Sequence, residues 1–295
     1  MLPDIIIMKA YRIRAMFLLE VFLVITIPQI CFADAFEYLT QSLAKVVAMA
    51  SLLNLADYDY NSGNSLFGYY LSEGSERGLR YSFEKNRSYV ILAAGDDDIV
   101  DLDLSITDEN GREILSDKNQ EPMAFLEFRP KYSGTYVINI KNYESYQTGF
   151  CSYVVLRNTG SGLFSLDDIT EALQNALKLA QAGGIFAKQF PQDRMVLFGG
   201  RYQEDDSNSV WDIGLESGRY MFLAAGSNNI NDVDITVIEQ YQLNNSSGET
   251  VCRDNESNDV AFCEFRAISR ERYCLTLKNY DSQGSGFVFG VLLQN

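Results

Sequence analysis

Most of the chain alternates between apolar and polar residues in short runs, and two stretches break this pattern with helical spacing. From 66 to 156 turn residues separate the runs at roughly every eight to twelve positions, which is typical of sandwich strands. In the run 101–106 the apolar residues share one face and the polar residues share the other. Residues 34–57 and 165–183 instead repeat apolar residues every three or four positions, which predicts two amphipathic helices.

A series of short sequence motifs occurs twice in the chain. Leu92–Gly95 returns as Leu223–Gly226 at an offset of 131 residues. Later pairs, such as Lys141–Tyr143 and Lys278–Tyr280, are 137 residues apart, so the second copy carries six extra residues, which fall in 240–249. The helices align at nearly the same offset, and the repeating unit is therefore a helix plus a sandwich.

The fold class that we predict is mainly β, with two tandem antiparallel β-sandwich domains, jelly-roll-like, each preceded by one amphipathic α-helix. The parts are a signal peptide at 1–33, a helix plus first sandwich at 34–157, a linker at 158–164 and a helix plus second sandwich at 165–295. We expect the apolar face of each helix to pack on its own sandwich or on the other helix. If the apolar faces of the helices were exposed instead, they would drive self-association.

The N-terminal segment has the parts of a secretory signal. Basic residues precede an apolar core at 21–27, Pro28 breaks this core, and small residues favour cleavage after Ala33 or Ala35. An uncleaved membrane anchor is the alternative, although the apolar run is shorter than the ~20 residues that a span requires. We therefore expect a secreted or periplasmic protein with no membrane contact after cleavage.

Cleavage removes Cys31 and leaves Cys151, Cys252, Cys263 and Cys274. An even number of cysteines in an oxidising compartment favours a disulfide. Three of the four belong to the second copy, so we predict one disulfide within that copy. Which pair forms it stays open, and free buried thiols are the alternative.

Charge and composition exclude several classes of protein. The chain has 24 basic and 40 acidic residues, a formal net charge of −16, which repels nucleic acid and anionic membrane. It contains no histidine, which removes Ser-His-Asp and Cys-His nucleophile pairs and His-ligated metal centres. We expect no enzyme here, and a hydrolase built on carboxylates alone is the enzymatic alternative.

A series of turn-rich motifs runs through the first copy: Ala94–Asp98, Asp101–Leu104, Asp108–Gly111, Phe128–Pro130, Ser133–Tyr136 and Gly149-Phe150. This series resembles the bacterial pre-peptidase C-terminal domain, a small sandwich related to collagenase collagen-binding domains and appended to many secreted proteases. The resemblance covers 80–157 and extends to 211–295, where Ala267 and Arg270 replace the proline and glycine of the signature. It implies a non-catalytic appendage.

Acidic residues are concentrated at the start of the motif series, where five aspartates occur within 96–103. Such carboxylates repel one another unless solvent or a cation compensates them, and calcium takes six to eight oxygen ligands from loops of this kind. Related collagen-binding domains use calcium. We therefore predict a calcium site formed by Asp96, Asp98, Asp101 and Asp103, with Asp232 and Asp234 in the second copy. In the alternative, the residues 96–98 form a solvated turn and the later aspartates bond loop amides.

Two kinds of residue are candidate contact points for a partner. Lys141–Tyr143 and its copy Lys278–Tyr280 either present matching contacts to a polymer or mark a strand end followed by a turn. Four tyrosines near the predicted loop after the first helix are candidate surface residues: Tyr58, Tyr60, Tyr69 and Tyr70.

The sequence thus predicts an exported, non-catalytic binding module that recognises an extracellular or periplasmic protein or polysaccharide and is stabilised by calcium. Two similar surfaces would raise avidity for a repetitive target. A structural or assembly subunit that self-associates through its helices is the main alternative. The oligomeric state stays open.

Overall fold

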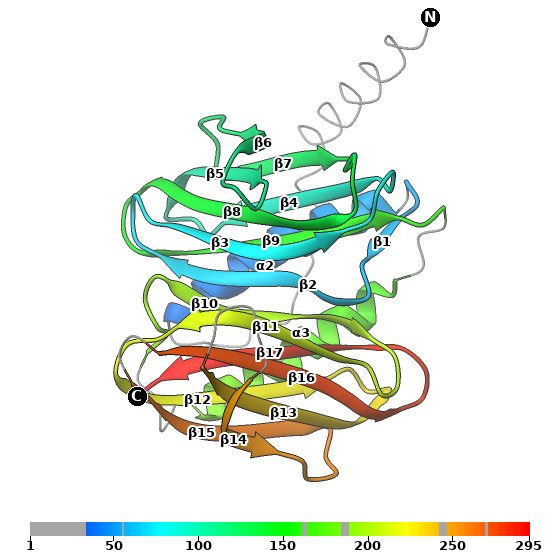
Figure 1. The fold of residues 1–295 in the computed structure, drawn as a ribbon, viewed down its shortest axis with the longest axis vertical. Helices are drawn as coiled ribbons and strands as arrows, with labels where there is room; N and C mark the ends of the chain where they lie inside the picture. The colour runs from blue at the N-terminus through cyan, green and yellow to red at the C-terminus, as the bar shows by residue number, and fades with distance from the viewer. Residues whose placement is uncertain (1–33, 55, 161–163, 184–188, 242–246, 269–270) are drawn as a thin grey trace, which may run out of the picture. The chain divides into compact units, whose positions relative to one another are not determined.

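The computed structural model describes residues 34–54, 56–160, 164–183, 189–241, 247–268 and 271–295 (Figure 1). The predicted signal peptide, part of the predicted linker and part of the longer loop of the second copy lie outside these residues. No helix within the described ranges is long and apolar enough to cross a membrane.

The described residues form two helices and seventeen strands. The helices are α2 (Asp34–Asn54) and α3 (Leu166–Gly183). The strands of the first repeat are β1 (Tyr58–Tyr60), β2 (Gly63–Leu71), β3 (Glu76–Phe83), β4 (Tyr89–Gly95), β5 (Ile99–Thr107), β6 (Glu113–Asp117), β7 (Met123–Phe128), β8 (Gly134–Ser145) and β9 (Gly149–Asn158). Those of the second repeat are β10 (Arg194–Tyr202), β11 (Ser207–Gly214), β12 (Gly218–Gly226), β13 (Ile230–Gln240), β14 (Gly248–Asp254), β15 (Val260–Ala267), β16 (Arg272–Ser282) and β17 (Gly286–Gln294).

Eight strands of each repeat follow the same order in space. In the first repeat β3-β8-β5-β6 form an outer sheet and β7-β4-β9-β2 form an inner one, and the second repeat has β11-β16-β13-β14 and β15-β12-β17-β10 in the same relation. Two facing four-stranded sheets with this connectivity make a jelly roll. The predicted fold class, mainly β with jelly-roll-like sandwiches each preceded by a helix, is confirmed.

Burial explains the hydrophobic patterns of the strands. In β5, Leu102 and Leu104 are buried in the core between the sheets, while Asp103 between them is only half-buried. In β9 the run from Gly149 to Leu156 is buried at every position, because its second face is covered by α2. A strand with one covered face alternates, and a strand with two covered faces is apolar throughout.

Each helix packs on the inner sheet of its own repeat, α2 on β4, β9 and β1 and α3 on β12 and β17. Their apolar stripes, with Leu39 and Val46 on α2 and Ile169 and Ala180 on α3, are completely buried. The Ser165 hydroxyl accepts a hydrogen bond from the Asp168 amide at 3.2 Å and so caps α3. Of the two arrangements expected from the sequence, each helix therefore adopts the packing on its own sandwich.

The two inner sheets are one continuous sheet, because β2 pairs with β10 (Figure 1). The pairing is antiparallel, with Tyr70 opposite Arg194 and Tyr69 opposite Met195. A Cβ atom at Gly200 would overlap the backbone of Gly63, so β10 needs a glycine at this approach. The repeats are thus joined through backbone hydrogen bonding as well as through the chain between them.

Buried polar contacts reinforce this junction. Arg201 on β10 forms an ion pair of 2.9 Å with Asp59, whose side chain is only 4% exposed. The Tyr202 hydroxyl, which is completely buried, donates a hydrogen bond to Asn64 on β2. Each contact links a residue of one repeat to a residue of the other, so both depend on the continuous sheet.

We expect Arg201→Leu to lower the free energy of unfolding by about 3 kcal/mol, because it leaves the Asp59 carboxylate buried without its counter-charge. Urea unfolding measures the loss. The control is Arg80→Leu, which removes an exposed pair with Glu109 and is expected to cost less than about 1 kcal/mol. Equal losses of unfolding free energy in the two variants would show that the ion pair of Arg201 with Asp59 does not stabilise the junction between the repeats.

Candidate functional site

The first predicted aspartates, Asp96 and Asp98, lie at the turn between β4 and β5. Asp96 is fully buried and its two carboxylate oxygens accept hydrogen bonds from the backbone amides of Phe150 at 2.7 Å and Asp98 at 3.0 Å. Burial raises the pKa of Asp96 to about 6, against the effect of these amides. Asp98 accepts a hydrogen bond of 2.6 Å from the Gln147 amide. The solvated turn of the alternative interpretation is therefore wrong for Asp96.

The remaining aspartates occupy equivalent positions on β5 and β13. Asp103 faces Lys141 across the strands, and Asp234 faces Lys278 in the same way. Asp101 is buried, and its Oδ1 atom has no hydrogen-bond partner within the described residues. Burial raises the pKa of Asp101, and the nearby charges of Asp103 and Glu144 add to this effect.

The second repeat reproduces this arrangement. Asp232 is buried, its Oδ1 atom also lacks a partner among the described residues, and burial raises its pKa, with the charge of Asp281 adding to the shift. Asn142 and Asn279, each one step away on the neighbouring strand, are fully buried with the same unpaired Oδ1 atom. The duplication therefore extends to individual unpaired acceptors.

The predicted calcium ligands are not clustered in either repeat. Across the described residues, no three Asp, Glu or Cys side chains are grouped so that they could hold a metal ion. Asp96 bonds backbone amides, and Asp103 faces a lysine. The oxygens that fit a hard cation are the unpaired Oδ1 atoms of Asp101 and Asp232, one in each repeat. Calcium stays a prediction that depends on these positions.

The two Lys-Asn-Tyr segments combine a structural residue with an exposed pair. Asn142 donates hydrogen bonds to the Leu71 carbonyl at 3.0 Å and to the Ser145 hydroxyl at 2.9 Å, which fixes the end of β8. Of the flanking residues Tyr143 is exposed and Lys141 is half-buried, with the Lys141 Nζ atom 4.5 Å from the centre of the Tyr143 ring. The segment is thus both a strand end and an exposed contact.

The second repeat carries the same pair. The Lys278 Nζ atom lies 4.1 Å from the centre of the Tyr280 ring. The two rings have nearly equal exposure, 52% for Tyr143 and 53% for Tyr280. We call each lysine and tyrosine pair a tyrosine surface. A cation above the ring holds the phenol in place by a cation–π attraction, so each surface is preorganised.

Two of the four candidate surface tyrosines are in the interior, so that interpretation is wrong for them. Tyr60 and Tyr69 are each 3% exposed. The Tyr60 ring packs edge-on against Phe287 of the other repeat, with 5.2 Å between the ring centres. Tyr69 belongs to the core between the sheets, where its ring stacks on Tyr153 with 6.0 Å between the ring centres. Tyr58 and Tyr70 are half-buried.

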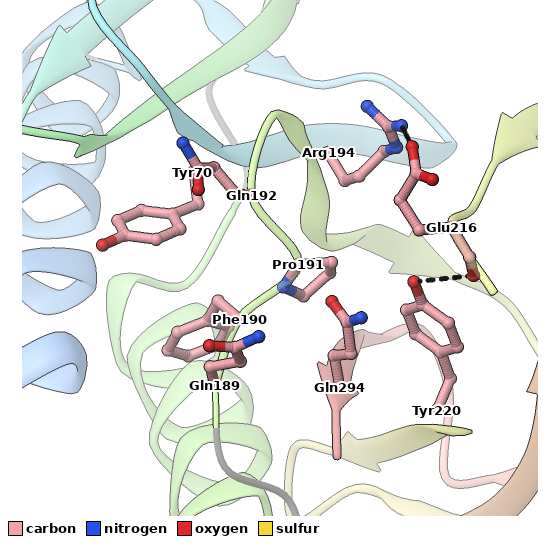
Figure 2. A pocket seen from close by; sticks show the side chains of 9 residues that line it. All are labelled: Tyr70, Gln189, Phe190, Pro191, Gln192, Arg194, Glu216, Tyr220 and Gln294. Atoms are coloured by element: carbon pink, nitrogen blue, oxygen red, sulfur yellow. Dashed lines mark hydrogen bonds and ion pairs between the residues drawn. The ribbon is translucent and has the colours of Figure 1, made fainter. Parts of the chain in front are cut away.

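A pocket of about 310 Å³ opens where the end of β2 meets the second repeat. Figure 2 shows Pro191 in the middle of its lining, with Tyr70 and Gln192 on one side and Gln294 and Tyr220 on the other. Sequence reasoning named only Tyr70 among these residues. The others come from strand ends and from the segment before β10, and no local motif connects them.

Two of the four described cysteines form a disulfide and the other two are free. Cys252 on β14 and Cys263 on β15 form a disulfide, which confirms one bridge within the second copy. Cys151 and Cys274 are free and buried, and burial raises the pKa of both thiols. Thiols of this kind are chemically inert.

Comparisons with known proteins give similarity to solved structures alone. No family description and no curated protein matches the sequence. One similar structure is the pre-peptidase C-terminal domain of a collagenase from Bacillus anthracis, at 11% identity over 33% of this chain and 93% of that one, with a TM-score of 0.28. Another is PliG, a periplasmic inhibitor of g-type lysozyme from Aeromonas hydrophila, at 13% identity over 35% of this chain and 87% of that one, with a TM-score of 0.26.

A variant of the carbohydrate-binding module CBM29-2 is also similar, at 10% identity over 34% of this chain and 70% of that one, with a TM-score of 0.23. With TM-scores below 0.3 these likenesses carry no argument about this chain. Its function has to be argued from its own residues.

The second repeat suggests a variant that isolates the charge of Asp96. There Ser227 accepts the equivalent bond from the Phe287 amide at 3.1 Å without an ionisable group. Because the pKa of Asp96 rises on folding from 3.8 to about 6, the folded state binds more protons between these values, and stability falls as pH rises through them.

We expect Asp96→Ser to remove this contribution. Relative to the variant, the wild-type protein should lose about 2 kcal/mol of unfolding free energy between pH 4 and pH 7, measured by urea unfolding across that range. Parallel stability curves for the two proteins would contradict the raised pKa.

Proposed function

We propose that this protein is an exported, non-catalytic binding module that recognises a neutral extracellular or periplasmic polysaccharide through its two tyrosine surfaces. The observation that carries the proposal is the duplication of an exposed, lysine-supported ring at equivalent positions, Tyr143 and Tyr280. Neither ring is needed in a core, since about half of each is exposed. An exposed aromatic plane beside hydrogen-bonding groups suits the apolar face of a sugar ring.

Charge supports a neutral ligand. The net charge of −16 disfavours an anionic polymer. The lysine of each tyrosine surface lies among acidic side chains: Lys141 is opposite Asp103 and Glu76, and Lys278 is opposite Asp234 and pairs with Asp205 at 3.4 Å. These acidic neighbours also disfavour an anionic ligand at the tyrosine surfaces. Ammonium and carboxylate groups can hydrogen-bond sugar hydroxyls as donor and acceptor.

Duplication supports a polymer over a small molecule. Two equivalent weak sites on one chain bind a repetitive target with an avidity that neither has alone. The alternative of self-association through the helices has less support, because the apolar stripes of α2 and α3 are buried against the continuous sheet.

We expect Tyr143→Ala and Tyr280→Ala each to weaken binding to a long neutral polysaccharide by about tenfold or more, because each variant loses the avidity of two sites. The double variant should lose binding. Biolayer interferometry on immobilised β-glucan, starch, mannan and chitin measures the affinities. Short oligosaccharides of the polymer that binds should occupy two sites on the wild-type protein and one on each single variant by calorimetry.

The matched control is Tyr132→Ala. Tyr132 is 63% exposed and also lies beside a lysine, with 5.4 Å from Lys131 Nζ to the ring centre, but the second repeat has no described counterpart. Its affinity should equal that of the wild-type protein. Equal losses from all three single substitutions would count against the tyrosine surfaces as the binding sites.

Calcium binding is a separate proposal, supported by the unpaired Oδ1 atoms of Asp101 and Asp232. A ligand that binds only the folded state raises its melting temperature. We expect millimolar calcium to raise the melting temperature by several degrees relative to a chelator, and Asp101→Asn/Asp232→Asn to abolish the rise. Asp97→Asn, an exposed aspartate paired with Lys45, is the control that should keep it. Indistinguishable melts of the wild-type protein would remove calcium from this account.

A further inference from the structure

The pocket beside Pro191 is lined by both polar and aromatic side chains. Its volume of about 310 Å³ is at the lower end of the range for small-molecule sites. We infer that it binds a single neutral hexose unit, at a place distinct from the tyrosine surfaces.

The charges of the pocket compensate each other within the protein. The Arg194 guanidinium and the Glu216 carboxylate form an ion pair of 3.0 Å on its rim (Figure 2). The Tyr220 hydroxyl donates a hydrogen bond to the Glu216 carbonyl at 3.2 Å and so holds this loop. With one cation and one anion already paired, the pocket has no excess charge to offer an ionic ligand.

One buried donor in the lining has no partner. The Nη1 atom of Arg194 donates to the Asp193 carbonyl at 2.8 Å and its Nη2 atom takes part in the ion pair, but the Nε atom has no hydrogen-bond partner among the described residues. A buried N–H group without an acceptor is costly. Because this N–H group is shielded from solvent, a ligand hydroxyl can accept from it only after the Arg194 side chain shifts toward the pocket.

Primary amides dominate the rest of the polar lining. The backbones of Gln189 and Gln294 bond each other in both directions, at 3.1 Å and 2.9 Å, which places the two residues opposite each other at the pocket. The Gln192 amide donates to the Ser72 hydroxyl at 2.6 Å, which fixes its orientation. A primary amide is both donor and acceptor, as a sugar hydroxyl is.

The pocket also has an apolar side. Phe190 is 4% exposed and its ring packs edge-on against Phe150, with 4.9 Å between the ring centres. Tyr70 stacks on the same Phe150 ring at 4.7 Å and is only half-buried. These packed rings are a rigid wall for the C–H face of a pyranose, while the amides and Arg194 meet its hydroxyls.

The test uses the full-length mature protein with glucose, mannose and galactose as separate probes, in saturation-transfer NMR and calorimetry at millimolar concentration. At least one hexose should bind the Tyr143→Ala/Tyr280→Ala protein, which lacks the tyrosine surfaces, with a stoichiometry of one. Gln189→Ala/Gln294→Ala should weaken that binding by about tenfold, because the hydroxyls lose their partners. Gln203→Ala, an exposed glutamine outside the pocket, should leave it unchanged.

This experiment tests the proposal for the pocket independently of the proposal for the tyrosine surfaces. Tyr143→Ala/Tyr280→Ala should keep the hexose binding whether or not polysaccharide binding is lost. Glucuronate and glucosamine, which carry a charge, should bind more weakly than the neutral sugar. The inference is overturned if no hexose binds, if the double glutamine variant binds as well as the wild-type protein, or if the charged sugars bind equally well.

Discussion

The antiparallel pairing of β2 with β10 is the contact on which the rest of the structure depends. A jelly roll alone leaves the edge of its sheet with unpaired backbone groups, which is a liability for association. Here the edge strands of the two repeats satisfy each other and become central strands of one sheet. Their buried side chains then contribute to a core cluster that includes residues of both repeats, such as Phe67 and Phe198.

The continuous sheet also determines which surfaces are free. Its one side carries α2 and α3, and its other side packs against the two outer sheets. The tyrosine surfaces lie on β8 and β16 of these outer sheets, so they are presented to solvent by rigid elements. Sites on strands are held more firmly than sites on loops.

The two repeats differ at a turn where either a charged or an uncharged side chain can accept the same backbone hydrogen bond. Asp96 and Ser227 accept the same backbone bond at equivalent turns, one with a charge that burial opposes and one without it. At Asp101 and Asp232, by contrast, both repeats keep a buried carboxylate with an unpaired oxygen. The turn position of Asp96 and Ser227 therefore needs only a hydrogen-bond acceptor, whereas the strand position of Asp101 and Asp232 has a carboxylate in both repeats.

Much of the fold could be predicted because its determinants are local. Period-two alternation identified the strands, spacing of three and four identified both helices, and the constant offset identified the repeat. The position of one disulfide in the second copy followed from counting. That Cys252 pairs with Cys263 could not be predicted, because β14 and β15 belong to different sheets and their neighbourhood depends on how the sheets pack.

What the sequence by itself determined is therefore the elements and their duplication. Only the tertiary structure decided that Tyr60 and Tyr69 are buried, that Asp96 is a buried acceptor and that a pocket exists beside Pro191. The physical reason is the range of the interactions. The alternation of side chains is set by their own strand, whereas their burial depends on which distant residues cover that face of the sheet, such as Phe287 against Tyr60.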